Sequence, residues 1–276
     1  MVGLTLAISV HSEIWTNRLS PPRLETIKPL LIISIGLMLI YFAGMILNDA
    51  IDSTRDKVNR PERPIPSGVI KNRDAWIVGF ILLVSGVLIS ILSTTEAFVS
   101  MCILSGCVIL YTFTHKWFLP AIIIMAICRG LVYLVAMSAF YAPPPYGLLI
   151  PFTIAIATYT ALLSFLGRFE NVKGQYKKSW IVWLLILPPF IPLVFNKVSL
   201  DLAWIFLIGY IFWVCLAWLD FKSVNSRFSA GMHKTLAGFC LLDSVLIGFL
   251  GVYHLVLVSG MCFLLTIVLH RRIIGT

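Results

Sequence analysis

The chain has few charged residues and no polar stretch long enough to form a separate soluble domain. Asp, Glu, Lys and Arg make up only 12% of its 276 residues, whereas hydrophobic residues make up 59% and the mean hydropathy is +0.97. This scarcity of charge excludes an ordinary soluble domain, in which about a quarter of the residues are charged. The six cysteines lack the Cys-x-x-Cys spacing of metal or redox sites. We therefore expect them to be small packing residues inside apolar segments.

Apolar segments recur along nearly the whole chain instead, which predicts an all-α membrane protein with eight to nine transmembrane helices. We expect a single domain over residues 1–276, with a first half at 27–166 and a second half at 167–276. The last two segments could also form one re-entrant hairpin. In sequence order the segments are Ile27–Leu47, Ala75–Leu92, Ala97–Thr114, Leu119–Tyr141, Gly147–Leu166, Trp180–Phe195, Leu200–Leu219, Thr235–Val252 and Tyr253–His270.

Positive charge predominates, with 21 Lys and Arg against 12 Asp and Glu and a formal net charge of +9. A nucleic acid partner is not expected, because most of the basic residues fall in loops on one side of the predicted helices. Cytoplasmic loops of membrane proteins carry such an excess of Lys and Arg. We therefore expect a multi-pass protein surrounded by lipid in the bacterial inner membrane, with these loops on the cytoplasmic side.

The segment that directly follows the first apolar run carries an unusual concentration of polar side chains. Residues 48–68 read NDAIDSTRDKVNRPERPIPSG. Asn48, Asp52 and Asp56 are four residues apart, so on a helix they share one face and drift by about 40° per step. Asp49 lies about 100° from Asn48. Carboxylates this close together repel one another unless a hard cation lies between them, and Mg²⁺ prefers such oxygen ligands.

Basic residues follow the carboxylates, at Arg55, Lys57, Arg60 and Arg63. Their side chains could hold phosphate oxygens that the metal does not reach, so the pattern indicates the handling of a diphosphate at a membrane surface. A plain solvated loop is the alternative interpretation. Such a loop would not need the prolines and glycine of RPERPIPSG, which fix one path for the backbone.

The order NDxxDxxxD followed by RPxRPxPSG resembles the first signature of the UbiA superfamily of intramembrane prenyltransferases. The resemblance implies about nine transmembrane helices around a central cavity. It also implies Mg²⁺-dependent transfer of a prenyl group from a prenyl diphosphate to a small acceptor, for which we expect an aromatic compound. The implied metal ligands are Asn48, Asp49, Asp52 and Asp56, of which Asp52 and Asp56 are also expected to be catalytic, and Arg60 and Arg63 are expected to bind the diphosphate.

The second signature of this superfamily, near DxxDxxGD, is altered here to GRFENVKGQ at Gly167–Gln175. Alignment on the family glycine puts Arg168 and Asn171 at positions that are normally acidic, and Glu170 is the only carboxylate left. We expect Glu170 and Asn171 to hold metal and Arg168 to pair with phosphate directly. UbiA-like members encoded in the Ebo metabolic cluster are similar in having a non-acidic second motif.

Other polar side chains lie within or at the ends of apolar segments. Arg129 needs a partner or a water-filled cavity there and fits the Arg-Gly pattern of the family, so we expect a catalytic place in the cavity wall; a structural salt bridge is the alternative. The family often has a tyrosine followed by a basic residue that contacts diphosphate, as Tyr111 is followed by His115 and Lys116. Interfacial anchoring is the alternative for these residues. The aromatic residues that we expect in the cavity wall are Phe113, Tyr133, Tyr159 and Phe165.

Two functions follow from these patterns. The first is a Mg²⁺-dependent membrane prenyltransferase, which the intact first motif favours. The second is a catalytically inactive UbiA-like protein that binds or transports a lipid or metabolite, which the altered second motif favours.

Overall fold

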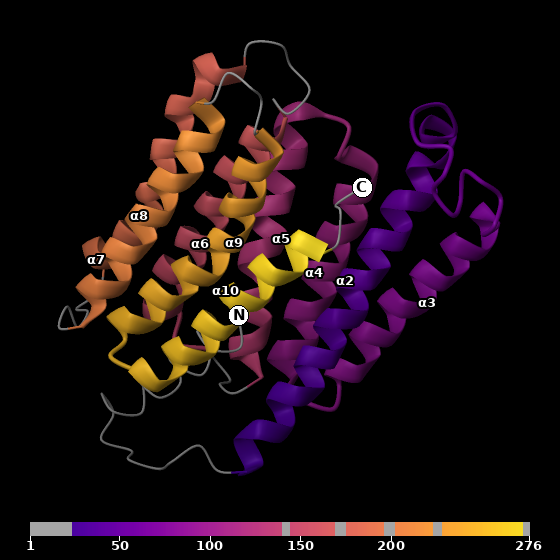
Figure 1. Ribbon diagram of the computed structural model, residues 1–276. Coiled ribbons are helices and arrows are strands. Elements are labelled where there is room, and N and C mark those ends of the chain that lie inside the picture. Colours follow the sequence, from indigo (N-terminus) through magenta and orange to yellow (C-terminus); the bar gives the residue numbers. More distant parts are fainter. Residues whose placement is uncertain (1–23, 140–143, 169–174, 196–201, 223–227, 273–276) are drawn as a thin grey trace. The chain divides into compact units, whose positions relative to one another are not determined.

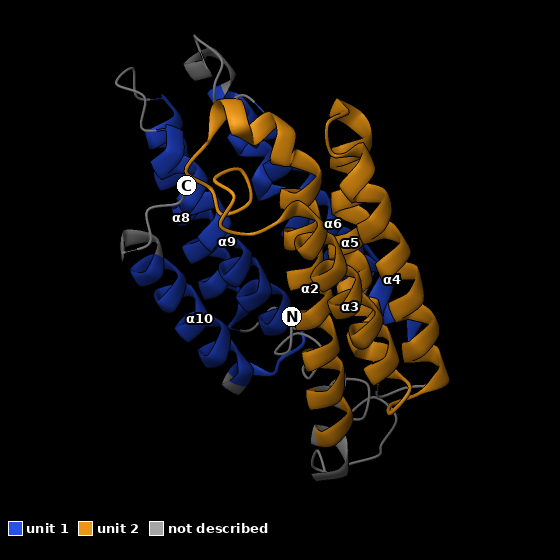
Figure 2. Ribbon diagram, turned by 90° about the vertical axis from the view of Figure 1, so that its right-hand side faces the viewer, with its two compact units in different colours: residues 1–21, 145–276 blue, residues 22–144 orange. Residues whose placement is uncertain are grey.

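The computed structural model describes residues 24–139, 144–168, 175–195, 202–222 and 228–272, and every regular element in these ranges is helical (Figure 1). The chain forms two compact units (Figure 2). Of the described residues, those up to 144 make one unit and those from 145 onward make the other. The all-α membrane fold expected from the sequence is confirmed.

The unit of residues 22–144 contains α2 (Leu24–Asn59), α3 (Asn72–Ser90), α4 (Thr95–Thr114) and α5 (Phe118–Ser138). With 36 residues, α2 is about 54 Å long, far more than the roughly 30 Å of a bilayer core. It therefore continues beyond its apolar run and carries the polar residues that follow. The helix ends at Asn59 because proline at position 61 disfavours a helical conformation of the residue before it.

Helices α2 and α3 run side by side (Figure 1) and approach closely where glycines face each other. A Cβ atom added to Gly86 would lie 2.8 Å from the backbone oxygen of Gly36, so no larger residue fits. Close backbone approach through small residues is a common way to pack helices in membranes. The start of α4 is fixed by Thr94, whose Oγ1 accepts from Ala97 N at 3.0 Å and donates to the Ser138 carbonyl at 2.6 Å.

The unit that begins at residue 145, unit 1 in Figure 2, has seven helical elements among its described residues. Two buried tyrosines donate hydrogen bonds to backbone carbonyls of neighbouring elements. Tyr159 Oη donates to Thr235 O at 2.6 Å, and Tyr210 Oη donates to Leu185 O. The elements are α6 (Tyr146–Gly167), η1 (Gln175–Ile186), η2 (Pro188–Phe190), α7 (Ile191–Phe195), α8 (Ala203–Lys222), α9 (Phe228–Phe249) and α10 (Tyr253–Arg272).

In the described residues, seven helices are long and apolar enough to cross a membrane, namely α3, α4, α5, α6, α8, α9 and the part of α2 from Leu31 onward. Two further apolar helical segments, Ser179–Phe195 and Leu255–Leu269, are shorter. The protein is thus a multi-pass membrane protein. The span expected at Trp180–Phe195 is divided into η1, η2 and α7, because prolines within it interrupt backbone hydrogen bonding. Helices α9 and α10 form a hairpin around Gly251, whose φ is +73°.

Candidate functional site

The polar residues near the end of α2 divide between two sides of the helix. We define the pocket face as Asn48 and Asp52, and the loop face as Asp49 and Asp56. The four-residue spacing predicted that Asp56 shares a face with Asn48 and Asp52, and the structure corrects this prediction. Because the drift of about 40° per step accumulates, Asp56 lies about 80° from Asn48 but only about 20° from Asp49 around the helix axis.

On the pocket face, Asp52 meets the two residues that directly follow the end of α4. His115 Nε2 lies 3.0 Å from Asp52 Oδ2, and His115 Nδ1 lies 2.6 Å from the carbonyl oxygen of Thr112. Lys116 Nζ lies 3.4 Å from the other carboxylate oxygen, Oδ1, which is longer than a good N–H···O hydrogen bond. Asp52 is therefore held mainly through one of its two oxygens.

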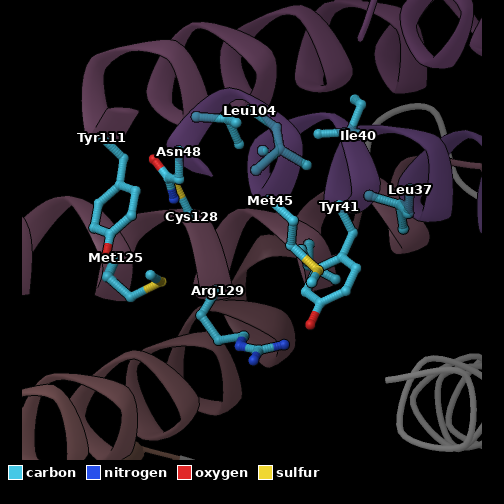
Figure 3. A pocket seen from close by; sticks show the side chains of 13 residues that line it. Leu37, Ile40, Tyr41, Met45, Asn48, Leu104, Tyr111, Met125, Cys128 and Arg129 are labelled. Carbon is cyan, nitrogen blue, oxygen red and sulfur yellow. The ribbon is translucent and has the colours of Figure 1, made fainter. Parts of the chain in front are cut away.

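A pocket of about 340 Å³ opens beside the pocket face, within the size range of small-molecule sites. Its walls come from α2, α4 and α5, and the lining includes the polar side chains of Tyr41, Asn48, Tyr111 and Arg129. Figure 3 shows Asn48 and Tyr111 toward one end of the pocket, and Leu37 and Tyr41 toward the other. The apolar lining residues are Leu37, Ile40, Met45, Leu104, Val108, Met125 and Val132.

The pocket face offers two oxygen atoms suited to a hard cation. Among the described residues, Asn48 Oδ1 and Asp52 Oδ1 are buried and accept no hydrogen bond of normal geometry. They lie one helical turn apart along α2, and such buried acceptors are costly unless a donor or a cation satisfies them. No three His, Cys, Asp or Glu side chains converge on one point in the described ranges. These donors therefore fit Mg²⁺ only if water and substrate phosphate complete its coordination, as is usual for this ion.

The loop face is neutralised by an arginine from the connection to α3. Arg63 Nη1 lies 2.8 Å from Asp56 Oδ2 and 3.4 Å from Asp49 Oδ1. The Asp56 side chain is only 12% exposed, so this ion pair is partly withdrawn from solvent. The diphosphate contact expected of Arg63 stays a prediction, since here its guanidinium pairs with two carboxylates.

The connection that carries Arg63 is ordered by its own hydrogen bonds. Ser67 N donates to Arg63 O at 2.9 Å, and Ile70 N donates to Pro64 O at 3.0 Å. Gly68 has φ of +84°, a left-handed conformation that glycine adopts without strain. The segment therefore follows the single path predicted from its prolines and glycine, and Arg63 fastens it to α2.

The structure brings together some of the predicted site residues. Arg129 and Tyr111 line the pocket with Asn48, as expected for a cavity wall, whereas the Arg60 side chain is exposed. Arg168 follows the last turn of α6 in the other compact unit and is also exposed. Glu170 and Asn171 lie outside the described residues, so their expected metal contacts and the pairing of Arg168 with phosphate stay predictions.

The aromatic residues expected in the wall lie elsewhere. Phe113 is exposed and stacks on Trp76. Tyr159 is buried against Phe239 in the unit that begins at residue 145. Aliphatic and methionine side chains form most of the apolar wall instead. Which residues face the pocket depends on the rotation of each helix about its axis, and residue type alone does not specify that rotation. His115 was considered as a diphosphate contact or an interfacial anchor, and its contact with Asp52 was missed because 63 residues separate the two in sequence.

Residues 14–272 match the profile of the UbiA prenyltransferase family. A digeranylgeranylglyceryl phosphate synthase from Sulfurisphaera tokodaii is 30% identical over 206 residues, which cover 66% of this chain and 71% of the relative. The enzyme of the same name from Methanosarcina mazei is 35% identical over 95 residues, a third of each chain.

A solved structure of a digeranylgeranylglyceryl phosphate synthase in membranes has a similar fold, with a TM-score of 0.58 and 18% identity. The alignment covers 90% of this chain and 93% of the other. The family match spans nearly the whole sequence and confirms the resemblance that the NDxxDxxxD and RPxRPxPSG motifs predicted. The placement near the Ebo-cluster members stays a prediction. This chain belongs to the UbiA prenyltransferase family.

Proposed function

We propose that this protein transfers a prenyl group from a prenyl diphosphate to a small acceptor and that the transfer depends on Mg²⁺. The observation that carries the proposal is the pair of buried oxygens, Asn48 Oδ1 and Asp52 Oδ1, which accept no hydrogen bond within the described residues. Asn48 lines a largely apolar pocket, and Asp52 lies one helical turn further along α2. An ion-binding group beside an apolar pocket matches a substrate with a diphosphate head and an isoprenoid tail.

The substrate would bind with its two ends in different surroundings. The isoprenoid tail would lie along the apolar wall toward Leu37 and Ile40, where burial of apolar surface contributes about 25 cal/mol per Å². The diphosphate would lie toward Asn48, with Arg129 and Lys116 supplying fixed positive charge. This polarity of the pocket orients the scissile bond near the pocket face of α2.

The chemistry breaks the bond between the allylic carbon and the diphosphate oxygen, and the diphosphate keeps the electron pair. A nucleophilic atom of the acceptor then forms a bond to that carbon and gives up its proton. Bound Mg²⁺ would neutralise charge that develops on the leaving diphosphate. Arg129 and Lys116 would stabilise the same charge from fixed positions, while the aliphatic wall excludes water that could capture the allylic cation.

The names of the relatives support a more specific acceptor. Digeranylgeranylglyceryl phosphate carries two geranylgeranyl groups on one glyceryl phosphate, so a transferase that adds the second group uses a prenylated glyceryl phosphate as acceptor. We propose a glyceryl phosphate lipid of this kind ahead of the aromatic acceptor expected from the sequence. The identities of 30% and 35% to synthases of this name support that order.

The proposed topology places the α2–α3 connection on the cytoplasmic side. The support is the distribution of basic residues, since Arg55, Lys57, Arg60, Arg63 and Lys71 all follow the apolar part of α2. Labelling of a cysteine introduced at exposed Val69 by an impermeant reagent tests this. Reaction in inverted but not in intact membrane vesicles is the expected result, after the exposed Cys102 and Cys262 have been replaced by serine.

The function itself is tested by turnover of radiolabelled geranylgeranyl diphosphate in membranes that contain the protein. Arms with geranylgeranylglyceryl phosphate and with aromatic acid acceptors distinguish the two acceptor classes. We expect turnover that requires Mg²⁺, stops with chelator and is lost in Asp52→Ala. Binding of the prenyl diphosphate without turnover on any acceptor would contradict the proposal and support a lipid-binding or transport role.

A further inference from the structure

We infer that His115 is a positioning residue that holds Asp52 so that one carboxylate oxygen stays available for the cation. This inference rests on the proposed function, because it concerns the same cation site. The carboxylate of Asp52 has two different surroundings: Oδ2 lies 3.0 Å from His115 Nε2, whereas Oδ1 is buried without a hydrogen bond of normal geometry among the described residues.

The orientation of the imidazole is fixed by its other nitrogen. His115 Nδ1 lies 2.6 Å from the backbone oxygen of Thr112, and a carbonyl oxygen can only accept. Nδ1 therefore donates to Thr112 O, and the ring plane is set by α4 backbone rather than by a mobile side chain. The His115 side chain is 14% exposed, so surrounding atoms also restrict its rotation. The backbone of α4 thus fixes the direction from which Nε2 reaches Asp52.

This geometry has a direct consequence for the carboxylate. Two simultaneous donations by one imidazole require a proton on each ring nitrogen, so in the imidazolium form Nδ1 donates to Thr112 O and Nε2 donates to Asp52 Oδ2. Rotation of the Asp52 carboxylate is thereby restrained, and Oδ1 is the oxygen left for another partner. Asn48 Oδ1, also buried without a hydrogen bond, lies one turn earlier on the same helix. A histidine that orients a carboxylate ligand typically changes metal affinity by 10–100-fold when it is replaced.

Lys116 does not supply the same restraint. Its Nζ lies 3.4 Å from Asp52 Oδ1, and its side chain is 45% exposed. A flexible, solvated ammonium at that distance contributes little to the orientation of a carboxylate. Phosphate oxygens can replace Asp52 as its partner, whereas the two hydrogen bonds of His115 are fully used within the protein. His115 and Lys116 therefore have different roles, although their positions in the sequence made them equivalent candidates for a diphosphate contact.

A matched pair of variants separates the two hydrogen bonds of His115. In His115→Gln the side-chain amide reaches the position of Nε2 and keeps a donor for Asp52. In His115→Asn the shorter amide reaches only the position of Nδ1, so the bond to Thr112 O is kept and the bond to Asp52 is lost. The wild-type full chain, both variants and Asp52→Asn are purified in detergent. The Mg²⁺ concentration that gives half-maximal thermal stabilisation is measured with inorganic diphosphate present, without any turnover.

We expect the midpoint for His115→Gln to stay within about threefold of the wild-type value and that for His115→Asn to rise by roughly 10–100-fold. Equal midpoints for His115→Asn and the wild type, or equal losses for Gln and Asn, would overturn the inference. If His115→Asn does not fold, His115→Leu, which also lacks a donor, takes its place with the same expectation. An unchanged Mg²⁺ response in Asp52→Asn would instead contradict the cation site of the proposed function.

Discussion

Asp52 and Asp56 are the same residue type four positions apart on one helix, and their surroundings differ in kind. Asp52, on the pocket face, keeps one buried oxygen without a hydrogen bond of normal geometry and is held through the other by His115. Asp56, on the loop face, forms an ion pair with Arg63 at 2.8 Å. One carboxylate is thus available to a ligand, while the other fastens a connection to the helix. A shared motif spacing therefore does not give its members the same surroundings, and the expected metal and catalytic roles of both residues stay predictions.

The strongest test of this comparison replaces each aspartate by asparagine. Asp52→Asn keeps the shape of the side chain but removes the charge that a cation requires on the pocket face. We expect Mg²⁺-dependent turnover to fall by more than about a hundredfold, equivalent to roughly 3 kcal/mol of lost stabilisation of the transition state. Asp56→Asn should reduce turnover per folded molecule by less than about tenfold. Initial rates at saturating Mg²⁺, normalised to folded protein, give the comparison.

Two controls accompany that measurement. The thermal unfolding midpoint of each variant separates loss of function from loss of folded protein, and we expect Asp56→Asn to lower it more than Asp52→Asn. A larger loss of turnover in Asp56→Asn than in Asp52→Asn would show that the division between the two faces is wrong.

The second prediction concerns the arginine of the loop face. Arg63→Met removes the partner of a carboxylate that is mostly buried, and we expect a loss of about 2 kcal/mol in the free energy of unfolding. Limited proteolysis between Arg60 and Ile70 should accelerate in parallel, because the connection is no longer fastened to α2. Thermal unfolding and the rate of cleavage are the measurements.

A double variant makes this prediction specific. Arg63→Met combined with Asp56→Asn removes the less exposed of the two carboxylates that lose their partner, so it should be more stable than Arg63→Met alone. If Arg63 instead acts mainly on the diphosphate, the single variant will keep its stability and raise the apparent KM for prenyl diphosphate.

The third prediction returns to the pocket face. Arg129 lines the same pocket as Asn48 and Tyr111, so Arg129→Gln should weaken binding of prenyl diphosphate by about tenfold, or roughly 1.4 kcal/mol. The change should be seen in the KM for prenyl diphosphate more than in the KM for Mg²⁺. Arg60→Gln is the matched control, since the Arg60 side chain is exposed. An equal change in the KM for prenyl diphosphate in the two variants would show that Arg129 does not contact the diphosphate specifically.

Much of the fold could be predicted from the sequence because span length and hydropathy are local properties of the chain. The segments expected at Ala97–Thr114 and Gly147–Leu166 agree with α4 and α6 within a few residues. An apolar helical segment covers Ser179–Phe195, where the Trp180–Phe195 span was expected. Its division into η1, η2 and α7 was not predicted, because hydropathy does not register the effect of Pro188 and its neighbours on backbone hydrogen bonds.

The candidate site was only partly predictable. The motif spacing correctly located the polar residues at the end of α2. It did not predict that Asp56 lies on the loop face, because the angular drift accumulates over eight residues. Contacts between distant segments were beyond the sequence pattern, as the contact of Asp52 with His115 illustrates. Such contacts depend on the rotation and axial position of α2, α4 and α5, which no local pattern specifies.

The smallest expected effect is that of replacing Lys116, and it distinguishes this residue from His115. Lys116 Nζ is 3.4 Å from Asp52 Oδ1 and its side chain is 45% exposed, so solvent screens the pair and its contribution to stability is at most about 1 kcal/mol. Lys116→Gln should therefore leave the unfolding midpoint and the Mg²⁺ midpoint nearly unchanged and raise the KM for prenyl diphosphate by only a few fold. Steady-state kinetics beside His115→Asn provide the comparison. A shift of the Mg²⁺ midpoint as large as that of His115→Asn would mean that both basic residues hold Asp52, and the pocket face would then depend on charge at the end of α4 rather than on one oriented hydrogen bond.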